Sequence, residues 1–155
     1  MIVLVMGVAG VGKTTIGEAL ASALGARFID ADDYHPPQNV EKMQAGIPLE
    51  DADRLPWLSK LNSVLRGESN AVLACSALKE SYRRRLSDGV RDFRIVYLHG
   101  APELIRERMK TRRHRYMPAA LLDSQLATLE PPEDAIKIDV AAPLEISVAA
   151  IVARL

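Results

Sequence analysis

A glycine-rich segment, GVAGVGKT at residues 7–14, has the residue types and the spacing of a phosphate-binding loop. Its glycines allow the backbone to wrap closely around an anion and to direct successive N–H groups toward it. Lys13 is predicted to reach the β- and γ-phosphates of a nucleoside triphosphate, and the Thr14 hydroxyl to ligate Mg²⁺. The predicted nucleotide-binding residues of this segment are Gly7, Val8, Ala9, Gly10, Val11, Gly12, Lys13, Thr14 and Thr15.

Two acids, Asp30 and Asp32, follow a short apolar run in the segment FIDADDYHP. We expect their carboxylates to point in different directions at the end of that run. Next to a phosphate loop, one of them can serve Mg²⁺ while the other faces a hydroxyl of an acceptor molecule. The alternative is a solvated acidic turn that caps the next helix.

Nucleotide-binding proteins that share a phosphate loop differ in their other motifs. The chain contains neither D-x-x-G nor N-K-x-D, which a GTPase would need for its switch and for guanine recognition. A conventional magnesium-binding acid is also missing after the apolar run AVLAC, which ends in Cys75 and Ser76. These absences argue against a GTPase and leave the acids after RFID as the candidates.

A basic segment, RERMKTRRHR at residues 106–115, carries six basic residues and one acid in a chain with 20 basic and 20 acidic residues. It lies where a mobile lid, about residues 108–120, would close over the phosphates. Arginine donors from such a lid would stabilise the charge on a transferring phosphoryl group. The alternatives are a solvated helix face and a nucleic-acid patch, and the zero net charge of the chain argues against nucleic acid.

Apolar runs and helical periodicities alternate along the whole chain. Strands are predicted in MIVLVM, RFID, AVLAC, FRIVYL and AIKIDV. Helices are predicted between them, among them one over Lys13–Leu24 and one from about Pro56 to Gly67. This pattern indicates an α/β fold in which helices cover both faces of a five-stranded parallel sheet. Residues 1–155 are expected to form a single domain.

The composition excludes several other classes of protein. One cysteine among 155 residues permits neither an internal disulfide framework nor a cysteine-rich zinc site. No apolar run approaches the roughly 20 residues that span a bilayer, and the first residues lack the basic region of a signal peptide. We therefore expect a soluble cytoplasmic protein with neither a membrane nor a nucleic acid as its partner.

Four stretches extend the pattern well beyond the phosphate loop. They are GVAGVGKTT, FIDADDYHPPQNVEKMQAGIPLEDADRLPWL, CSALKESYRRRL and MPAALLDSQLATLEPPEDA. Together they resemble the gluconokinase family in its thermoresistant type, small P-loop kinases that phosphorylate D-gluconate at its 6-hydroxyl. The resemblance implies the fold of nucleoside and shikimate kinases with a lid. It also implies ATP and Mg²⁺ as cofactors, D-gluconate as the substrate and a homodimer as the assembly.

The resemblance implies roles for individual residues as well. Asp32 matches the acid that such kinases place against the acceptor hydroxyl, and Asp30 matches the acid nearer Mg²⁺. Arg54 matches a substrate-side arginine of the related shikimate kinases, which suits the carboxylate of a sugar acid. The candidates for further substrate contacts are His35, Ser76, Lys79 and Arg83.

Adenine-binding and lid residues are implied in the second half of the chain. Pro143 precedes the last predicted helix, where relatives hold one face of the adenine, and Arg108 can hold the other face. The lid of the family usually reads R-x-G-H-[FY]-M, whereas this chain has RRHRYM. His114 thus replaces the usual glycine and Arg115 the usual histidine, so Arg112 and Arg115 are the two candidates for the catalytic lid donor.

Two other functions are compatible with these motifs. One is a kinase for another small polar metabolite, such as shikimate or another sugar acid. The other is a regulatory module that binds a nucleotide and transfers no phosphoryl group. The acids after RFID and the basic lid segment argue against the module, because a pure sensor needs neither.

Overall fold

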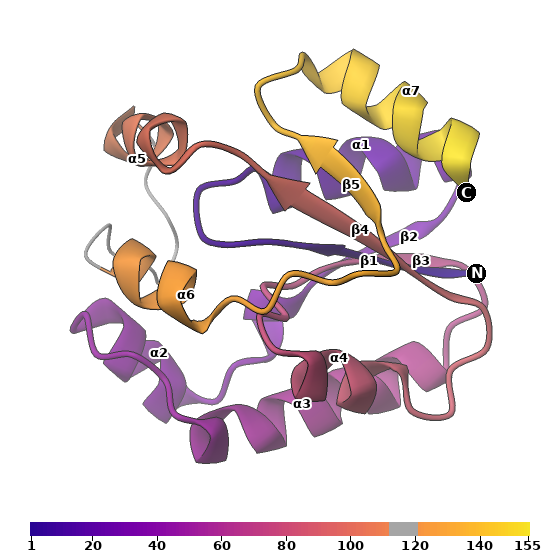
Figure 1. Cartoon of the computed structure of the whole chain (residues 1–155). Coiled ribbons are helices and arrows are strands. Elements are labelled where there is room, and N and C mark those ends of the chain that lie inside the picture. Colours follow the sequence, from indigo (N-terminus) through magenta and orange to yellow (C-terminus); the bar gives the residue numbers. More distant parts are fainter. Residues whose placement is uncertain (112–120) are drawn as a thin grey trace.

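The computed structural model describes residues 1–111 and 121–155 of the chain. Within these ranges five strands form one parallel sheet in the order β2-β3-β1-β4-β5 (Figure 1). This confirms the predicted five-stranded parallel sheet. The strands are β1 (Ile2–Met6), β2 (Arg27–Asp30), β3 (Ala71–Ala74), β4 (Phe93–His99) and β5 (Ile136–Asp139).

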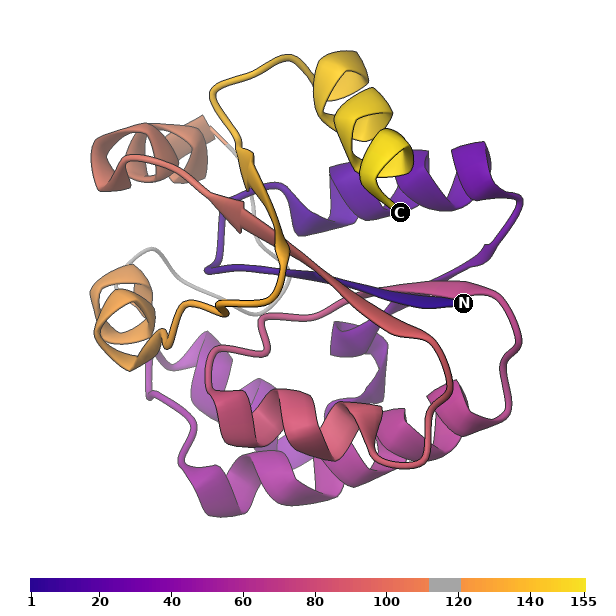
Figure 2. The same ribbon diagram turned by 45° about the vertical axis from the view of Figure 1, so that its right-hand side comes forward.

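Helices cover both faces of the sheet, as predicted (Figures 1 and 2). α1 and α7 pack on one face, and α3 and α4 pack on the other. The bounds of these helices are α1 (Lys13–Leu24), α3 (Asp51–Arg66), α4 (Glu80–Ser87) and α7 (Leu144–Arg154).

The central strand β1 is buried along its whole length. Val3 and Val5 belong to the apolar core on the side of α1 and α7. Ile2, Leu4 and Met6 belong to the core on the side of α3 and α4. Because successive side chains of a strand point to opposite faces, burial on both faces explains why this run is apolar without interruption.

Further helical segments gather at the carboxyl ends of the strands, opposite the end of the molecule where the two chain termini lie (Figure 1). The chain leaves β1 toward the face of α1 and leaves β3 toward the face of α4. In open α/β sheets, ligands bind in the crevice that forms where neighbouring strands diverge in this way. The segments at this edge are η1 (Ala31–Tyr34), α2 (Pro37–Gln44), α5 (Pro102–Thr111) and α6 (Leu122–Thr128).

Helix α3 begins at Asp51, before the predicted start at about Pro56. Glu50 is its N-cap residue, and the carboxylate of Asp53 accepts a hydrogen bond from the Glu50 N–H at 2.8 Å. Pro56 lies inside the helix on an exposed side, where water can hydrate the carbonyl that the proline leaves without a donor. The predicted start was wrong because the capping acids decide where the helix begins. The additional turn carries Arg54.

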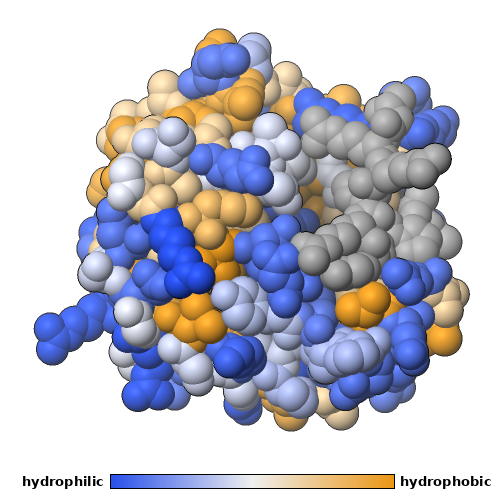
Figure 3. All heavy atoms as spheres, turned by 180° about the vertical axis from the view of Figure 1, so that it is seen from behind, coloured by the Kyte–Doolittle hydropathy of each residue, from blue (hydrophilic) through white to orange (hydrophobic). Residues whose placement is uncertain are grey.

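Hydrophilic and hydrophobic residues are interspersed on the face of the molecule seen from behind in Figure 3. Large exposed hydrophobic side chains in the described part of the chain are Ile47, Leu55, Ile146 and Val152. None of the helices in the described ranges has both the length and the apolar content that crossing a bilayer requires.

Gly7 offers a test of why the first residue of the phosphate loop is a glycine. Its φ is +152°, and a Cβ at this position would lie 2.7 Å from the backbone oxygen of Leu98 on β4. Gly12 also has a positive φ, +101°, but a Cβ there would meet no described atom within 4 Å. We therefore expect Gly7→Ala to lower the free energy of unfolding by about 1–3 kcal/mol more than Gly12→Ala does. Urea unfolding of both variants without ligands measures the difference, and equal losses would contradict the proposed clash.

Candidate active site

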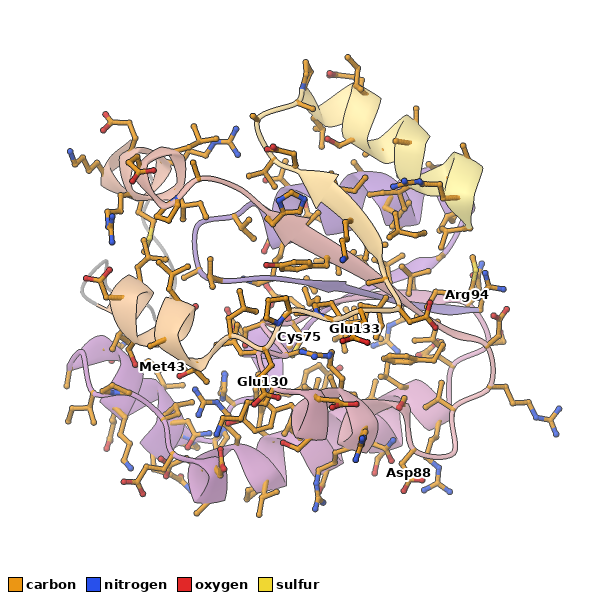
Figure 4. All side chains as sticks on the ribbon, viewed as in Figure 1. Met43, Cys75, Asp88, Arg94, Glu130 and Glu133 are labelled. Atoms are coloured by element: carbon orange, nitrogen blue, oxygen red, sulfur yellow. The ribbon has the colours of Figure 1, made fainter. Side chains whose placement is uncertain are left out.

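A cavity of about 410 Å³ lies at the carboxyl edge of the sheet, within the usual size range of small-molecule sites. Its walls come from the phosphate loop, from the ends of β2 and β3, and from α2, α3 and α6. Met43 on α2 and Cys75 after β3, both labelled in Figure 4, belong to two of these walls. The lining residues are Ala9, Gly10, Gly12, Lys13, Thr14, Thr15, Asp30, Asp32, His35, Met43, Pro48, Leu49, Arg54, Trp57, Ala74, Cys75, Ser76, Leu121, Ser124, Gln125 and Thr128.

The phosphate loop joins β1 to α1, which confirms the predicted order of strand, loop and helix. Gly12 is the N-cap of α1 in the left-handed conformation, and no side chain caps the helix. The N–H groups of residues 13–15 are therefore placed to bind an anion in the cavity. The Nζ of Lys13 donates to the carbonyl of Val8 at 3.0 Å. Burial lowers the pKa of Lys13, and the negative charge of Asp32 opposes that shift.

Asp30 and Asp32 both line the cavity, where the two acids were expected to serve different partners. The chain leaves the extended conformation after Asp30 and enters the 3₁₀ segment η1. The Oδ1 of Asp30 accepts a hydrogen bond from the Asp32 N–H at 2.9 Å and so caps this segment. Asp32 therefore lies outside the strand, so the alternation of side chains along a strand does not apply to it. Asp30 caps the 3₁₀ segment and still lines the cavity.

His35 contributes a polar edge to the cavity and stacks on Trp57. The two ring centroids lie 4.0 Å apart, and the ring planes differ by 15°. Trp57 is buried, and its Nε1–H donates to the carbonyl of Ala31 at 2.7 Å, which connects α3 to the acidic turn. Burial, with a smaller contribution from Arg54, lowers the pKa of His35 from 6.5 to about 4. The imidazole is therefore neutral near pH 7.

Arg54 also lines the cavity, and a polar network between α3 and α4 sets its position. Its Nη1 donates to the carbonyl of Leu49 and, at 3.3 Å, to the hydroxyl of Tyr82. The Tyr82 hydroxyl in turn donates to Asp51, which also forms an ion pair with Lys79 at 3.2 Å. The hydrogen bond from Tyr82 is the main reason why the pKa of Asp51 is lowered. The network presents an oriented guanidinium to the cavity, which suits a carboxylate ligand.

The structure separates the remaining predicted substrate residues. Ser76 lines the cavity, whereas Lys79 and Arg83 lie outside its lining. Arg83 is buried and donates to the carbonyls of Ala77 at 2.8 Å and Glu130 at 2.9 Å, the latter labelled in Figure 4. Arg83 thus joins α4 to the segment that follows α6. A contact of either basic residue with substrate stays a prediction.

Gln125 on α6 is a cavity residue that the sequence patterns did not single out. Its Oε1 accepts a hydrogen bond from the N–H of Ala9 at 2.7 Å, across 116 positions of sequence. Gln125 is buried, so this bond attaches α6 directly to the phosphate loop. No local pattern pairs two such distant positions, and the one available signal was the stretch LLDSQLATLE within the family resemblance.

The two residues predicted to hold the adenine, Arg108 and Pro143, lie outside the cavity lining. Both are close to the segment between β5 and α7. The Nη2 of Arg108 on α5 donates to the carbonyl of Val140 at 2.6 Å, and Pro143 is the N-cap of α7. Arg108 is therefore held beside the segment between β5 and α7 that contains Pro143. Their contact with adenine stays a prediction. The predicted lid donors, Arg112 and Arg115, lie outside the described residues.

The neutral state of His35 predicts a loss of stability in mild acid. The pKa of His35 is about 4 in the folded chain and 6.5 ordinarily, so the unfolded chain binds more protons between these values. The free energy of unfolding should therefore fall as the pH drops from about 6.5 to about 4, by on the order of 3 kcal/mol from this residue. Urea unfolding of the wild type and of His35→Gln across this range isolates the contribution as a difference. A difference that does not change with pH would contradict a buried, neutral His35.

Known proteins match the chain over most of its length. A family model described as an AAA domain matches residues 2–132. The chain is 48% identical to the gluconokinase of Gluconobacter oxydans (strain 621H), a match that covers 84% of this chain and 75% of the relative. It is 44% identical to the thermosensitive gluconokinase of Escherichia coli (strain K12), over 88% of this chain and 78% of the relative.

Solved structures agree with the sequence matches. A gluconokinase from Sinorhizobium meliloti 1021 has a TM-score of 0.89 at 44% identity, over 97% of this chain and 89% of that chain. A shikimate kinase from Aquifex aeolicus has a TM-score of 0.66 at 18% identity, over 99% of this chain and 95% of that chain. The second likeness confirms the predicted P-loop kinase fold and carries nothing about substrate. With identities of 44–48% to gluconokinases over most of each protein, the chain belongs to the gluconokinase family.

Proposed function

We propose that the chain transfers the γ-phosphoryl group of ATP to the 6-hydroxyl of D-gluconate, which yields 6-phosphogluconate and ADP. The observation that carries this proposal is one cavity in which the phosphate loop, the acids Asp30 and Asp32 and the guanidinium of Arg54 meet. A polyol with a primary hydroxyl and a carboxylate offers a ligand to both the acids and the guanidinium. Identity of 44–48% to gluconokinases supports this choice of substrate.

The phosphate loop supplies the donor side of the reaction. The N–H groups at the start of α1 and the ammonium of Lys13 would bind the triphosphate. Thr14 and Asp30 line the same cavity and offer oxygen ligands, which Mg²⁺ prefers, so the residues fit the predicted ion. When bound with the nucleotide, Mg²⁺ neutralises charge on the phosphates. Within the described ranges, no group of three or more His, Cys, Asp or Glu side chains forms a separate metal site.

The acid turn and Arg54 supply the acceptor side. Arg54 would bind the carboxylate of gluconate, and Asp32 would accept a hydrogen bond from the 6-hydroxyl. As the bond from the hydroxyl oxygen to the γ-phosphorus forms, the bond from that phosphorus to the β–γ bridging oxygen breaks, and ADP leaves with the electron pair. The hydroxyl proton passes to Asp32 late in the transfer. Arg112 and Arg115 remain the proposed lid donors.

The alternative functions have less support from the described residues. The likeness to a shikimate kinase at 18% identity concerns the fold and not the substrate. A regulatory module would have no use for an acid and a guanidinium in the same cavity as the phosphate loop. The homodimer is proposed on the resemblance and the cytoplasmic location on the composition and apolar pattern, and light scattering during size-exclusion chromatography tests the dimer.

Asp32→Asn tests the role of the acceptor acid. We expect gluconate-dependent ADP release to fall by on the order of 10² or more, because an amide cannot take the proton. Nucleotide affinity should stay at the wild-type value. Asp33→Asn changes the same turn at an exposed position outside the cavity lining and should keep wild-type turnover. Asp30→Asn should instead raise the Mg²⁺ concentration that half-maximal activity requires.

A coupled assay of ADP release with gluconate, with shikimate and with no acceptor measures these effects, and calorimetry measures nucleotide affinity. Wild-type turnover by Asp32→Asn, or a loss of nucleotide binding, would show that the role assigned to this acid is wrong. A wild-type protein that uses shikimate and not gluconate would favour the other kinase. Hydrolysis or binding without any dependence on an acceptor would favour the regulatory module.

Tyr82→Phe tests whether the network behind Arg54 serves the carboxylate of the substrate. The variant loses the hydroxyl that Arg54 and Asp51 share, so the guanidinium loses one of its positioning bonds. We expect the KM for gluconate to rise roughly 3- to 10-fold while the KM for ATP stays constant, since the guanidinium keeps its other positioning bond, to the carbonyl of Leu49. Tyr97→Phe on β4 is the control for loss of a tyrosine hydroxyl outside the cavity lining. An equal change in both KM values would point to a general structural effect.

A further inference from the structure

The amide of Asn39 has one orientation that its surroundings permit. Asn39 is buried on α2, and its Nδ2 lies 2.9 Å from the carbonyl oxygen of Asp53 on α3. A carbonyl oxygen can only accept a hydrogen bond, so the NH₂ end of the amide must face Asp53. The reversed amide would bring two acceptor oxygens to the same short distance. The Nδ2 position of Asn39 is therefore that of a donor.

The same donor determines which nitrogen of His35 carries the proton. The Nδ2 of Asn39 lies 3.3 Å from the Nδ1 of His35. Because Nδ2 donates, Nδ1 must accept, and the single proton of the neutral imidazole is then on Nε2. The stack on Trp57 holds the plane of the ring, and the side chain of His35 is only 3% exposed. The low pKa of His35 agrees with a neutral ring in this environment.

The protonated nitrogen of His35 faces the acid that the proposed mechanism uses. Its Nε2 lies 3.7 Å from the Oδ1 of Asp32, which is too far for a direct hydrogen bond, and both residues line the cavity. A hydroxyl group can accept from the Nε2–H of His35 and donate to the carboxylate of Asp32 at the same time. With the other tautomer, the hydroxyl would meet two acceptors and could satisfy only one of them.

We propose that Asn39 is a positioning residue that holds His35 in the Nε2–H tautomer, so that His35 and Asp32 together bind one hydroxyl of the substrate. That the substrate with this hydroxyl is a polyol rests on the proposed function. The tautomer of His35 does not depend on that function. Among the residues that the structure describes, the charged groups recorded near the His35 ring are Asp32 from η1 and Arg54 from α3. Both are retained in the variants that test the proposal.

The tautomer can be measured directly in the wild-type protein. Long-range ¹H–¹⁵N spectra of the protein labelled at its three histidines distinguish Nε2–H, Nδ1–H and doubly protonated rings, and His35→Gln assigns the signal. We expect the Nε2–H pattern for His35 from about pH 7 down to about pH 5, since the pKa of this ring is about 4. An Nδ1–H pattern, or rapid exchange between the two tautomers, would overturn the proposal without any variant of Asn39.

Asn39→Asp then tests whether Asn39 is the cause. A carboxylate at this position accepts instead of donating, so we expect a proton on Nδ1 of His35 and a pKa of His35 above its wild-type value. Asn62→Asp is the matched control, because Asn62 likewise donates its Nδ2 to backbone carbonyls, those of Leu86 at 2.9 Å and Asp88 at 2.8 Å. The control should keep the wild-type pattern of His35. A folded Asn39→Asp protein with the wild-type pattern would show that Asn39 does not set the tautomer.

Steady-state kinetics of the same proteins test whether the Nε2–H tautomer contributes to the binding of gluconate. For Asn39→Asp we expect kcat/KM for gluconate to fall at least about 10-fold at pH 7 while the KM for ATP changes less than about 2-fold. Asn62→Asp should behave like the wild type in both respects. A changed tautomer with unchanged gluconate kinetics would refute the shared hydroxyl. A wild-type protein with the Nε2–H pattern but no gluconate activity would contradict the proposed function and leave the role of Asn39 standing.

Discussion

The site depends on the pairing of β1, which lies between β3 and β4 and is buried on both faces. Because all strands run in parallel, the segments after β1, β2 and β3 meet at one edge of the sheet. The phosphate loop follows β1, Asp30 ends β2, and Cys75 and Ser76 follow β3. The N–H of Gly7 donates to the carbonyl of Ser76 at 3.4 Å, which joins two of these segments directly. The parallel sheet thus brings the groups that bind phosphate close to the groups that bind the acceptor.

Hydrogen bonds from buried side chains then attach the cavity walls to that edge. Gln125 connects α6 to the phosphate loop, Trp57 connects α3 to the acidic turn, and Asn39 connects α2 to α3. Each bond joins a side chain of one element to a backbone group of another, and the bond of Gln125 satisfies the buried N–H of Ala9. These bonds also limit where His35 and the acids can lie. The same interactions therefore support the fold and arrange the site.

Charge in the cavity is arranged for an anionic ligand on each side. Burial lowers the pKa of Lys13, and the attraction of Asp32 partly opposes this effect. A bound triphosphate would favour the ammonium further, because nearby opposite charge stabilises the charged form. Arg54 is oriented by neutral oxygens, and the ion pair of Asp51 with Lys79 stands behind it. A neutral His35, near both Asp32 and Arg54, offers directed hydrogen bonding without adding charge.

The phosphate loop and the alternation of strands and helices could be predicted from the sequence, because they depend on local spacing and on the apolar period of single segments, and the family could be predicted from the likeness of four longer stretches. The start of α3 was mispredicted, although the capping acids before Pro56 signal it locally. The packing of the helices places Lys79 and Arg83 outside the cavity lining, where they bond to Asp51 and Glu130, and brings Gln125 to Ala9. The contact of Asn39 with His35 likewise depends on tertiary structure, since hydrogen bonds between distant or turned segments depend on how helices pack against the sheet, and no local pattern encodes that packing.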